Sequence, residues 1–132
     1  MSTLLLNTLT GKTSAGSIVV TGEGGSTTTN MQQGLVKCWV NFNGTGTIAI
    51  RDSYNATSIT DNGTGDTNIT IASDMGNADY APSGVCGETG GTEMWEITSR
   101  AVGVLRILSY KSDTGASVDA TVNSVTIHGD LA

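Results

Sequence analysis

The sequence predicts an all-β fold, an antiparallel β-sandwich or jelly-roll-like domain with an extended N-terminal arm. The chain has 132 residues, which suits one domain and is too short for two independent cores. Val, Ile and Thr recur throughout, and the 18 glycines mark many tight turns between them. No window shows a helical period with caps. We therefore expect about eight or nine strands.

Residues 1–34 differ in composition from the rest of the chain. Residues 3–9 and 17–21 are typical of short strands, and residues 22–30 have the glycine and threonine content of a flexible connector. We therefore divide the chain into an arm with its connector, residues 1–34, and a β-sandwich domain, residues 35–132. An arm of this kind can dock on a neighbouring subunit or anchor the protein to a larger assembly.

The first half of the domain alternates apolar and polar side chains. Residues 36–42 do so with period two, which is the signature of a half-buried strand. Trp39 interrupts the polar face, so we expect that face to contact something as well. Asn43-Gly44 predicts a type I′ hairpin before the strand at 47–51. Residues 61–66 predict a second hairpin, which leads into a strand whose Ile69 and Ile71 share one face.

The second half resumes this pattern after Pro82, the single proline. Residues 93–100 and 102–110 are strand-like, and residues 113–115 predict a turn. In the final run the apolar positions change parity, from Val118, Ala120 and Val122 to Val125 and Ile127. Such a change predicts a β-bulge at 123–124, or a strand that passes from one sheet to another.

Charge and composition exclude several classes of partner. The net charge is −6 and only six residues are basic, so no basic stripe is available for nucleic acid. The first residues lack the features of a signal peptide and no segment has transmembrane length, so we expect synthesis in a cytoplasm and no membrane insertion. Aromatic residues make up 5% of the chain. So few large side chains give one protomer a thin core, which favours packing against copies of itself.

The nucleophiles and bases of the chain form no recognisable catalytic set. His128 is the single histidine and has no partners at triad or zinc spacing. Cys38 lies in a strand-like run with no activating base nearby in the sequence, so we expect a buried, reduced thiol rather than a nucleophile. A disulfide between Cys38 and Cys86 stays open, because pairing cannot be deduced from spacing.

Three further features have alternative interpretations. The loop Asp61 to Asp66 offers oxygen ligands for Ca²⁺, but Gly63 stands where the second ligand should be, and a hairpin turn is favoured. Glu93 and Glu96 could form a carboxylate pair for glycoside cleavage, although their neighbours indicate an ordinary strand. The aromatic residues could line a carbohydrate-binding surface or fill the core or a subunit interface: Trp39, Tyr54 and Trp95. We therefore expect no catalytic, cofactor-binding or metal-binding residues, and no enzymatic activity.

The central part of the chain, Lys37 to Gly65, resembles a module found in tail-fibre-like structural proteins of marine bacteriophages, including those that infect cyanobacteria. The matching stretches are Trp39-Val40-Asn41-Phe42, Gly44-Thr45-Gly46-Thr47, Arg51-Asp52-Ser53 and the run from Ser58 to Gly65, with looser similarity at Asp79-Tyr80-Ala81, at Met1 to Leu4 and at His128-Gly129. Such modules carry alanine at the position of Cys38, so the resemblance gives its thiol no role.

The resemblance implies a structural protein of the virion, exposed on the particle surface, β-rich and trimeric. A fibre head or adhesin involved in host attachment would contact its own copies, other tail proteins and a host surface glycan or protein. The alternative is a capsid decoration protein, a cement or knob held on the major capsid protein by residues 1–34. In both cases the protein would be made in the bacterial cytoplasm and would need no cofactor.

Overall fold

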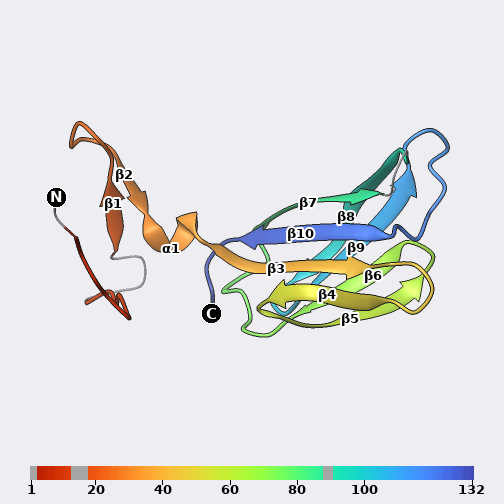
Figure 1. Cartoon of the computed structure of the whole chain (residues 1–132), viewed down its shortest axis with the longest axis horizontal. Coiled ribbons are helices and arrows are strands. Elements are labelled where there is room, and N and C mark those ends of the chain that lie inside the picture. Colours follow the sequence, from red (N-terminus) through yellow and green to blue (C-terminus); the bar gives the residue numbers. More distant parts are fainter. Residues whose placement is uncertain (1–2, 13–17, 88–90) are drawn as a thin grey trace. The chain divides into compact units, whose positions relative to one another are not determined.

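The computed structural model describes residues 3–12, 18–87 and 91–132 (Figure 1). The chain forms two compact units, Met1–Leu35 and Val36–Ala132. Strands account for 56% of the described residues and helix for 3%. The prediction of an all-β fold is therefore confirmed.

The N-terminal unit contains one small hairpin. β1 (Val19–Thr21) pairs antiparallel with β2 (Thr28–Asn30), and a single helical turn, α1 (Met31–Gly34), follows at once. The glycine-rich segment expected to be a flexible connector is instead the turn of this hairpin, closed by a 2.8 Å bond from the Gly22 amide to the Thr27 carbonyl. The prediction of a strand at residues 3–9 is wrong, because no neighbouring strand supplies it with a hydrogen-bond ladder.

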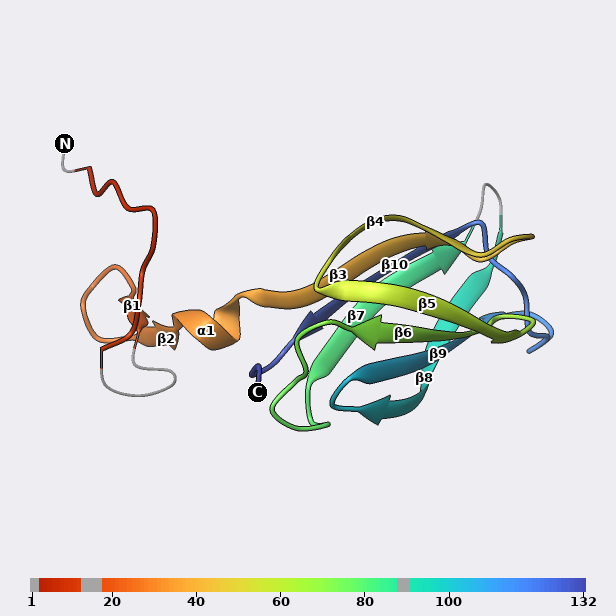
Figure 2. The same cartoon turned by 90° about the horizontal axis from the view of Figure 1, so that it is seen from below.

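The second unit is a sandwich of two four-stranded antiparallel sheets (Figure 2). The first sheet has the order β4-β3-β10-β7, formed by β4 (Ala49–Tyr54), β3 (Val36–Asn43), β10 (Val122–His128) and β7 (Ala81–Gly87). The second has the order β5-β6-β9-β8, formed by β5 (Ala56–Gly63), β6 (Asp66–Ile71), β9 (Val104–Lys111) and β8 (Glu93–Ala101).

The core lies between the two sheets, and the two central strands of each sheet supply most of it. Along β6, β9 and β10, and along β3 from Cys38 onward, every second residue is buried, as period-two alternation predicts. Two residues from the loop between β6 and β7, Met75 and Tyr80, complete the cluster. The strand contributions are Cys38, Val40, Phe42, Ile69, Ile71, Leu105, Ile107, Val125 and Ile127. Phe42 and Tyr80 are the only aromatic members among the described residues, which agrees with the thin core expected from composition.

The connection from β3 to β4 differs from the predicted type I′ turn. The loop spans five residues between the strand ends, and its positive φ falls at Gly46. The Asn43 side chain accepts hydrogen bonds from the Thr45 amide and hydroxyl, and so builds a side-chain turn of its own. Gly44 is held by a 2.9 Å bond from its amide to the Ala120 carbonyl, and a Cβ there would approach that oxygen to 2.8 Å.

The parity change in the final run has a different cause from the predicted bulge. Residues 118–121 form no strand, and β10 begins only at Val122 with regular alternation through 123–124. Asn123 takes a core-facing position that the sequence pattern assigns to an apolar residue. Its buried amide donates to the Ala120 carbonyl at 2.9 Å and accepts from the Ser109 hydroxyl at 3.2 Å. The register shift in β10 lies at Ile127/His128, against β3.

Asn55 carries the chain from the first sheet to the second. It lies between β4 and β5 and is the only non-glycine residue with a positive φ, 57°, in the described part of the chain. Its side chain donates to the carbonyls of Lys37 and Ser73 and accepts from the Ser73 amide. The crossing between layers is therefore fixed by one side chain.

Candidate functional site

The outward face of the β4-β3-β10-β7 sheet brings aromatic and hydroxylic side chains together. Period-two alternation places Trp39 on this face, opposite the buried Cys38 and Val40. The strand register then aligns two rows across the sheet. One row is Tyr54, Trp39, Thr126 and Ser83; the other is Asp52, Asn41, Ser124 and Val85.

A shallow depression of about 360 Å³ lies on this face over β3, β10 and β7. Nine residues line it, and period-two alternation turns six of them outward. We call these six the Trp39 face: Trp39, Asn41, Ser83, Val85, Ser124 and Thr126. Its volume is at the lower end of the roughly 300–1,000 Å³ typical of small-molecule sites. Val85 is 63% exposed, so part of this surface is both apolar and open to solvent.

Two hydrogen bonds organise the polar part of the Trp39 face. The Asn41 amide donates to the Ser124 hydroxyl at 2.6 Å, and the hydroxyls of Ser83 and Thr126 lie 2.8 Å apart. Arg51 also donates to the Asn41 carbonyl oxygen, at 3.4 Å. These bonds hold the side chains in place, while a hydroxyl that accepts one bond can still donate another.

The third aromatic residue considered for a surface site, Trp95, does not join the other two. It packs against the hydrophobic core, and its ring lies 3.2 Å from the position of a Cβ built on Gly84. Trp39 and Tyr54, in contrast, are direct cross-strand neighbours on the outer face, where Tyr54 is 55% exposed. Of the three aromatic residues, one therefore packs against the core and two lie on the outer face.

Both cysteines are free thiols. Cys38 is fully buried, and burial raises its pKa to about 11, so it is held in the protonated, unreactive form. Burial also raises the pKa of the half-buried Cys86, partly offset by a hydrogen bond with Ser109. His128 ends β10 and pairs with Ala81 of β7.

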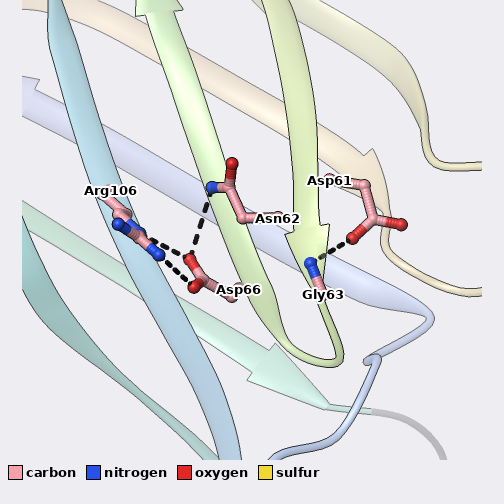
Figure 3. A network of polar contacts seen from close by, with 5 residues as sticks. All are labelled: Asp61, Asn62, Gly63, Asp66 and Arg106. Atoms are coloured by element: carbon pink, nitrogen blue, oxygen red, sulfur yellow. Dashed lines mark hydrogen bonds and ion pairs between the residues drawn. The ribbon is translucent and has the colours of Figure 1, made fainter.

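The Asp61 to Asp66 segment forms the β5–β6 hairpin turn favoured by the sequence (Figure 3). The Asp61 carboxylate accepts a 2.8 Å bond from the Gly63 amide. Asp66 accepts two hydrogen bonds from Arg106 on β9, one of them at 2.8 Å, and one from Asn62. The bond with Arg106 lowers the Asp66 pKa. Both carboxylates therefore brace the turn and its neighbouring strand.

Glu93 and Glu96 do not face each other. Both lie on β8, three positions apart, and period-two alternation puts them on opposite faces of the sheet. Glu93 has the parity of Trp95, which packs inward, and pairs with Lys111, whereas Glu96 pairs with Leu108. The two carboxylates cannot flank one glycosidic bond in the arrangement that hydrolysis requires.

Sequence reasoning identified Trp39 and Tyr54 but missed their polar neighbours. Ser124 and Thr126 could have been found, because they alternate with the apolar Val125 and Ile127. Ser83 and Val85 could not, because β7 consists largely of Pro, Ser and Gly and shows no alternation. Only the pairing of β7 with β10 places them beside Trp39.

No family model matches the chain, and no curated protein or solved structure matches it. Over residues 3–12, 18–87 and 91–132, no three His, Cys, Asp or Glu side chains gather in a way that could hold a metal ion. The one described helix, α1, has four residues, and no helix in the described part of the chain has the length and apolar character to cross a membrane.

Proposed function

We propose that this protein is a non-enzymatic structural component of a bacteriophage particle, exposed on the particle surface as the head of a trimeric fibre or adhesin. The sandwich is the displayed domain, and residues 1–35 attach it to the rest of the particle. The resemblance of Lys37 to Gly65 to tail-fibre-like proteins supports a place in a phage particle. The division of the chain into two units supports separate roles for the sandwich, as the displayed domain, and for the N-terminal unit, as the attachment.

The observation that carries this proposal is the exposed apolar surface of the N-terminal unit. Of its residues that the structure describes, 3–12 and 18–35, none is buried. Leu4 and Leu5 are 80% and 87% exposed, and five further apolar side chains are exposed as well, namely Leu6, Leu9, Val19, Val20 and Leu35. So much exposed apolar surface marks a segment that packs against another protein. In the particle, that protein is a second copy or a neighbouring tail component.

The test of this role uses the full chain with Leu4, Leu5 and Leu6 all changed to Ser. We expect the variant to fold with an unchanged thermal midpoint, because these side chains lie outside the sandwich core. It should no longer enter particles during infection. Thr8→Ser with Thr10→Ser alters the same segment without removing apolar surface and should enter particles normally. Normal incorporation of the leucine variant would contradict the proposal.

The oligomeric state is tested separately, by light scattering after gel filtration of the full chain. A trimer at micromolar concentration is the expected result, because both the thin core and the exposed leucines favour self-association. A monomer would contradict the fibre-head form of the proposal.

The second candidate function is capsid decoration, which the same exposed leucines favour. In that case the N-terminal unit clamps onto the shell, and purified protein binds to capsids that lack it. The leucine variant would then fail to bind while the threonine control binds. Saturable binding to tailless capsids favours decoration, and binding to tails alone favours the fibre head.

A further inference from the structure

The Trp39 face combines one apolar platform with a rim of neutral hydrogen-bonding groups. The platform is the indole of Trp39 together with Val85, and Tyr54 lies beside it on the next strand. The rim consists of one amide and three hydroxyls, from Asn41, Ser83, Ser124 and Thr126. None of the six lining side chains carries a charge.

This pattern selects the kind of ligand. Phosphate-bearing ligands need cationic side chains or helix N-termini, and the lining contains neither. The nearby Arg51 already donates to Asn41 and to the Phe42 and Thr121 carbonyls, and the acidic Asp52 pairs with Asn41. A purely apolar ligand would displace water from the amide and hydroxyl groups without replacing the hydrogen bonds that they still make outward, at a cost for each polar group desolvated. A sugar ring satisfies both parts, because one face of the ring presents C–H groups while its edge presents hydroxyls.

The size of the surface argues against a protein occupant. A stable protein interface buries about 800 Å² on each partner, from roughly 20–30 residues. The depression holds about 360 Å³ and is lined by nine residues. It therefore has room for a small ligand, such as one or two sugar rings, and not for a folded partner.

The hydrogen bonds within the rim prepare it for such a ligand. Because Asn41 and Ser124 are already joined at 2.6 Å, and Ser83 and Thr126 at 2.8 Å, little side-chain freedom is lost on binding. Each hydroxyl keeps capacity for a second bond. The groups come from three adjacent strands of one sheet, which holds them in a fixed relation to the indole.

We infer that the Trp39 face binds an uncharged saccharide, with a sugar ring stacked on the indole and its hydroxyls bonded to the Asn41–Ser124 and Ser83–Thr126 pairs. This inference deepens the proposed role in host attachment and rests on it for its biological meaning. The chemical class of the receptor is then a neutral surface glycan.

The test measures binding of the full chain to neutral oligosaccharides of glucose, mannose, galactose, xylose and N-acetylglucosamine. In a Trp95→Phe variant, Trp39 is the single tryptophan, so the fluorescence of the protein reports on the Trp39 face directly. We expect at least one of these probes to shift the Trp39 emission saturably. Trp39→Ala, followed by calorimetry, should weaken binding roughly tenfold or more through loss of the stacking contact.

Two further variants keep the test decisive even where Trp39→Ala disturbs the sheet. Val85→Arg fills the depression from an exposed position, so it should fold normally and abolish binding. Tyr110→Ala, which removes a half-buried aromatic residue from β9 of the other sheet, should leave binding unchanged.

Four outcomes would overturn the inference. The first two are the lack of a saturable response to any neutral probe, and binding of polygalacturonate or inorganic phosphate alone. The third is equal sugar binding by the Val85→Arg protein. The fourth is loss of self-association in that variant without any sugar binding by the natural protein, which would assign the face to a second copy. Incorporation into particles is measured in a separate experiment, so a negative result for sugar binding does not contradict the proposed role in the virion.

Discussion

Replacing Asn55 offers a sharp test of how the two sheets are connected. This residue lies between β4 and β5 with φ of 57°, where an L side chain is strained and glycine is not. Its side chain also makes three hydrogen bonds, to the Lys37 carbonyl at 2.9 Å and to the Ser73 carbonyl and amide at 3.2 and 2.7 Å. Backbone conformation and side-chain bonding are therefore two separable contributions.

Asn55→Gly removes the bonds but suits the backbone. The two Ser73 bonds are exposed, so water can replace part of them, and we expect a loss of about 1–2 kcal/mol. Asn55→Ala removes the same bonds and adds the cost of the left-handed conformation, reduced by the lower chain entropy of alanine when unfolded. It should therefore be less stable than Asn55→Gly by about 1 kcal/mol.

The assay is urea unfolding of both variants, followed by tryptophan fluorescence. The curves are analysed with one shared m value, the slope of the free energy of unfolding against urea concentration. Asn55→Asp serves as the control for the side-chain bonds: it keeps an oxygen acceptor for the Ser73 amide and tolerates positive φ, but it sets a second oxygen against the Lys37 and Ser73 carbonyls. It should be less stable than the natural protein. An alanine variant as stable as the glycine variant would refute the argument from backbone conformation.

Three other predictions concern stability. Burial raises the Cys38 pKa from 9.0 to about 11, so stability present below pH 9 should be lost as the pH rises to 11; Cys38→Ala should flatten this alkaline loss in pH-dependent unfolding. The Asp66 pKa is lowered below 3.8 by Arg106, so its stabilisation is present above that value and lost as the pH falls; Asp66→Asn should reduce the acid sensitivity, and an unchanged acid profile would count against the pair. Gly65→Ala should cost about 3 kcal/mol in urea unfolding, because its Cβ would lie 2.3 Å from the Ser109 carbonyl, whereas the unobstructed Gly46→Ala should cost about 1 kcal/mol; equal losses would contradict the steric argument.

The strands that the sequence predicted well are those with one buried face. In β3 and β6 the burial of alternate side chains is a direct consequence of where the core lies, so the pattern of Val40 and Phe42, or of Ile69 and Ile71, reveals the strand. The strand β7 shows no such pattern, because an edge strand can carry Pro82 and Gly84 without losing ladder hydrogen bonds at the sheet centre.

The predictions of the β3–β4 turn and of a bulge at 123–124 were wrong where a polar side chain takes the place of a backbone or apolar contact. Asn43 builds the β3–β4 turn with its own carboxamide, so the Asn-Gly pair does not adopt the predicted geometry. Asn123 occupies a core position because Ser109 and the Ala120 carbonyl satisfy its amide. The Asn43 turn is a local motif, since its partner Thr45 lies two positions along the chain, and it competes with the Asn-Gly turn that the sequence also predicts. The burial of Asn123 cannot be derived from local sequence, since it depends on Ser109, which the fold brings to it from β9. The same holds for the candidate site, which joins Trp39 to side chains more than forty positions away.

The central claim is that the protein is displayed on the surface of a phage particle. Immunogold labelling tests it most directly, with antibody raised against the sandwich and applied to intact, purified virions of the phage that encodes the chain. The proposed fibre head predicts gold at the tail tips, and the decoration alternative predicts gold spread over the shell. Particles that bind an antibody to the major capsid protein but carry no gold from the sandwich antibody would contradict the claim.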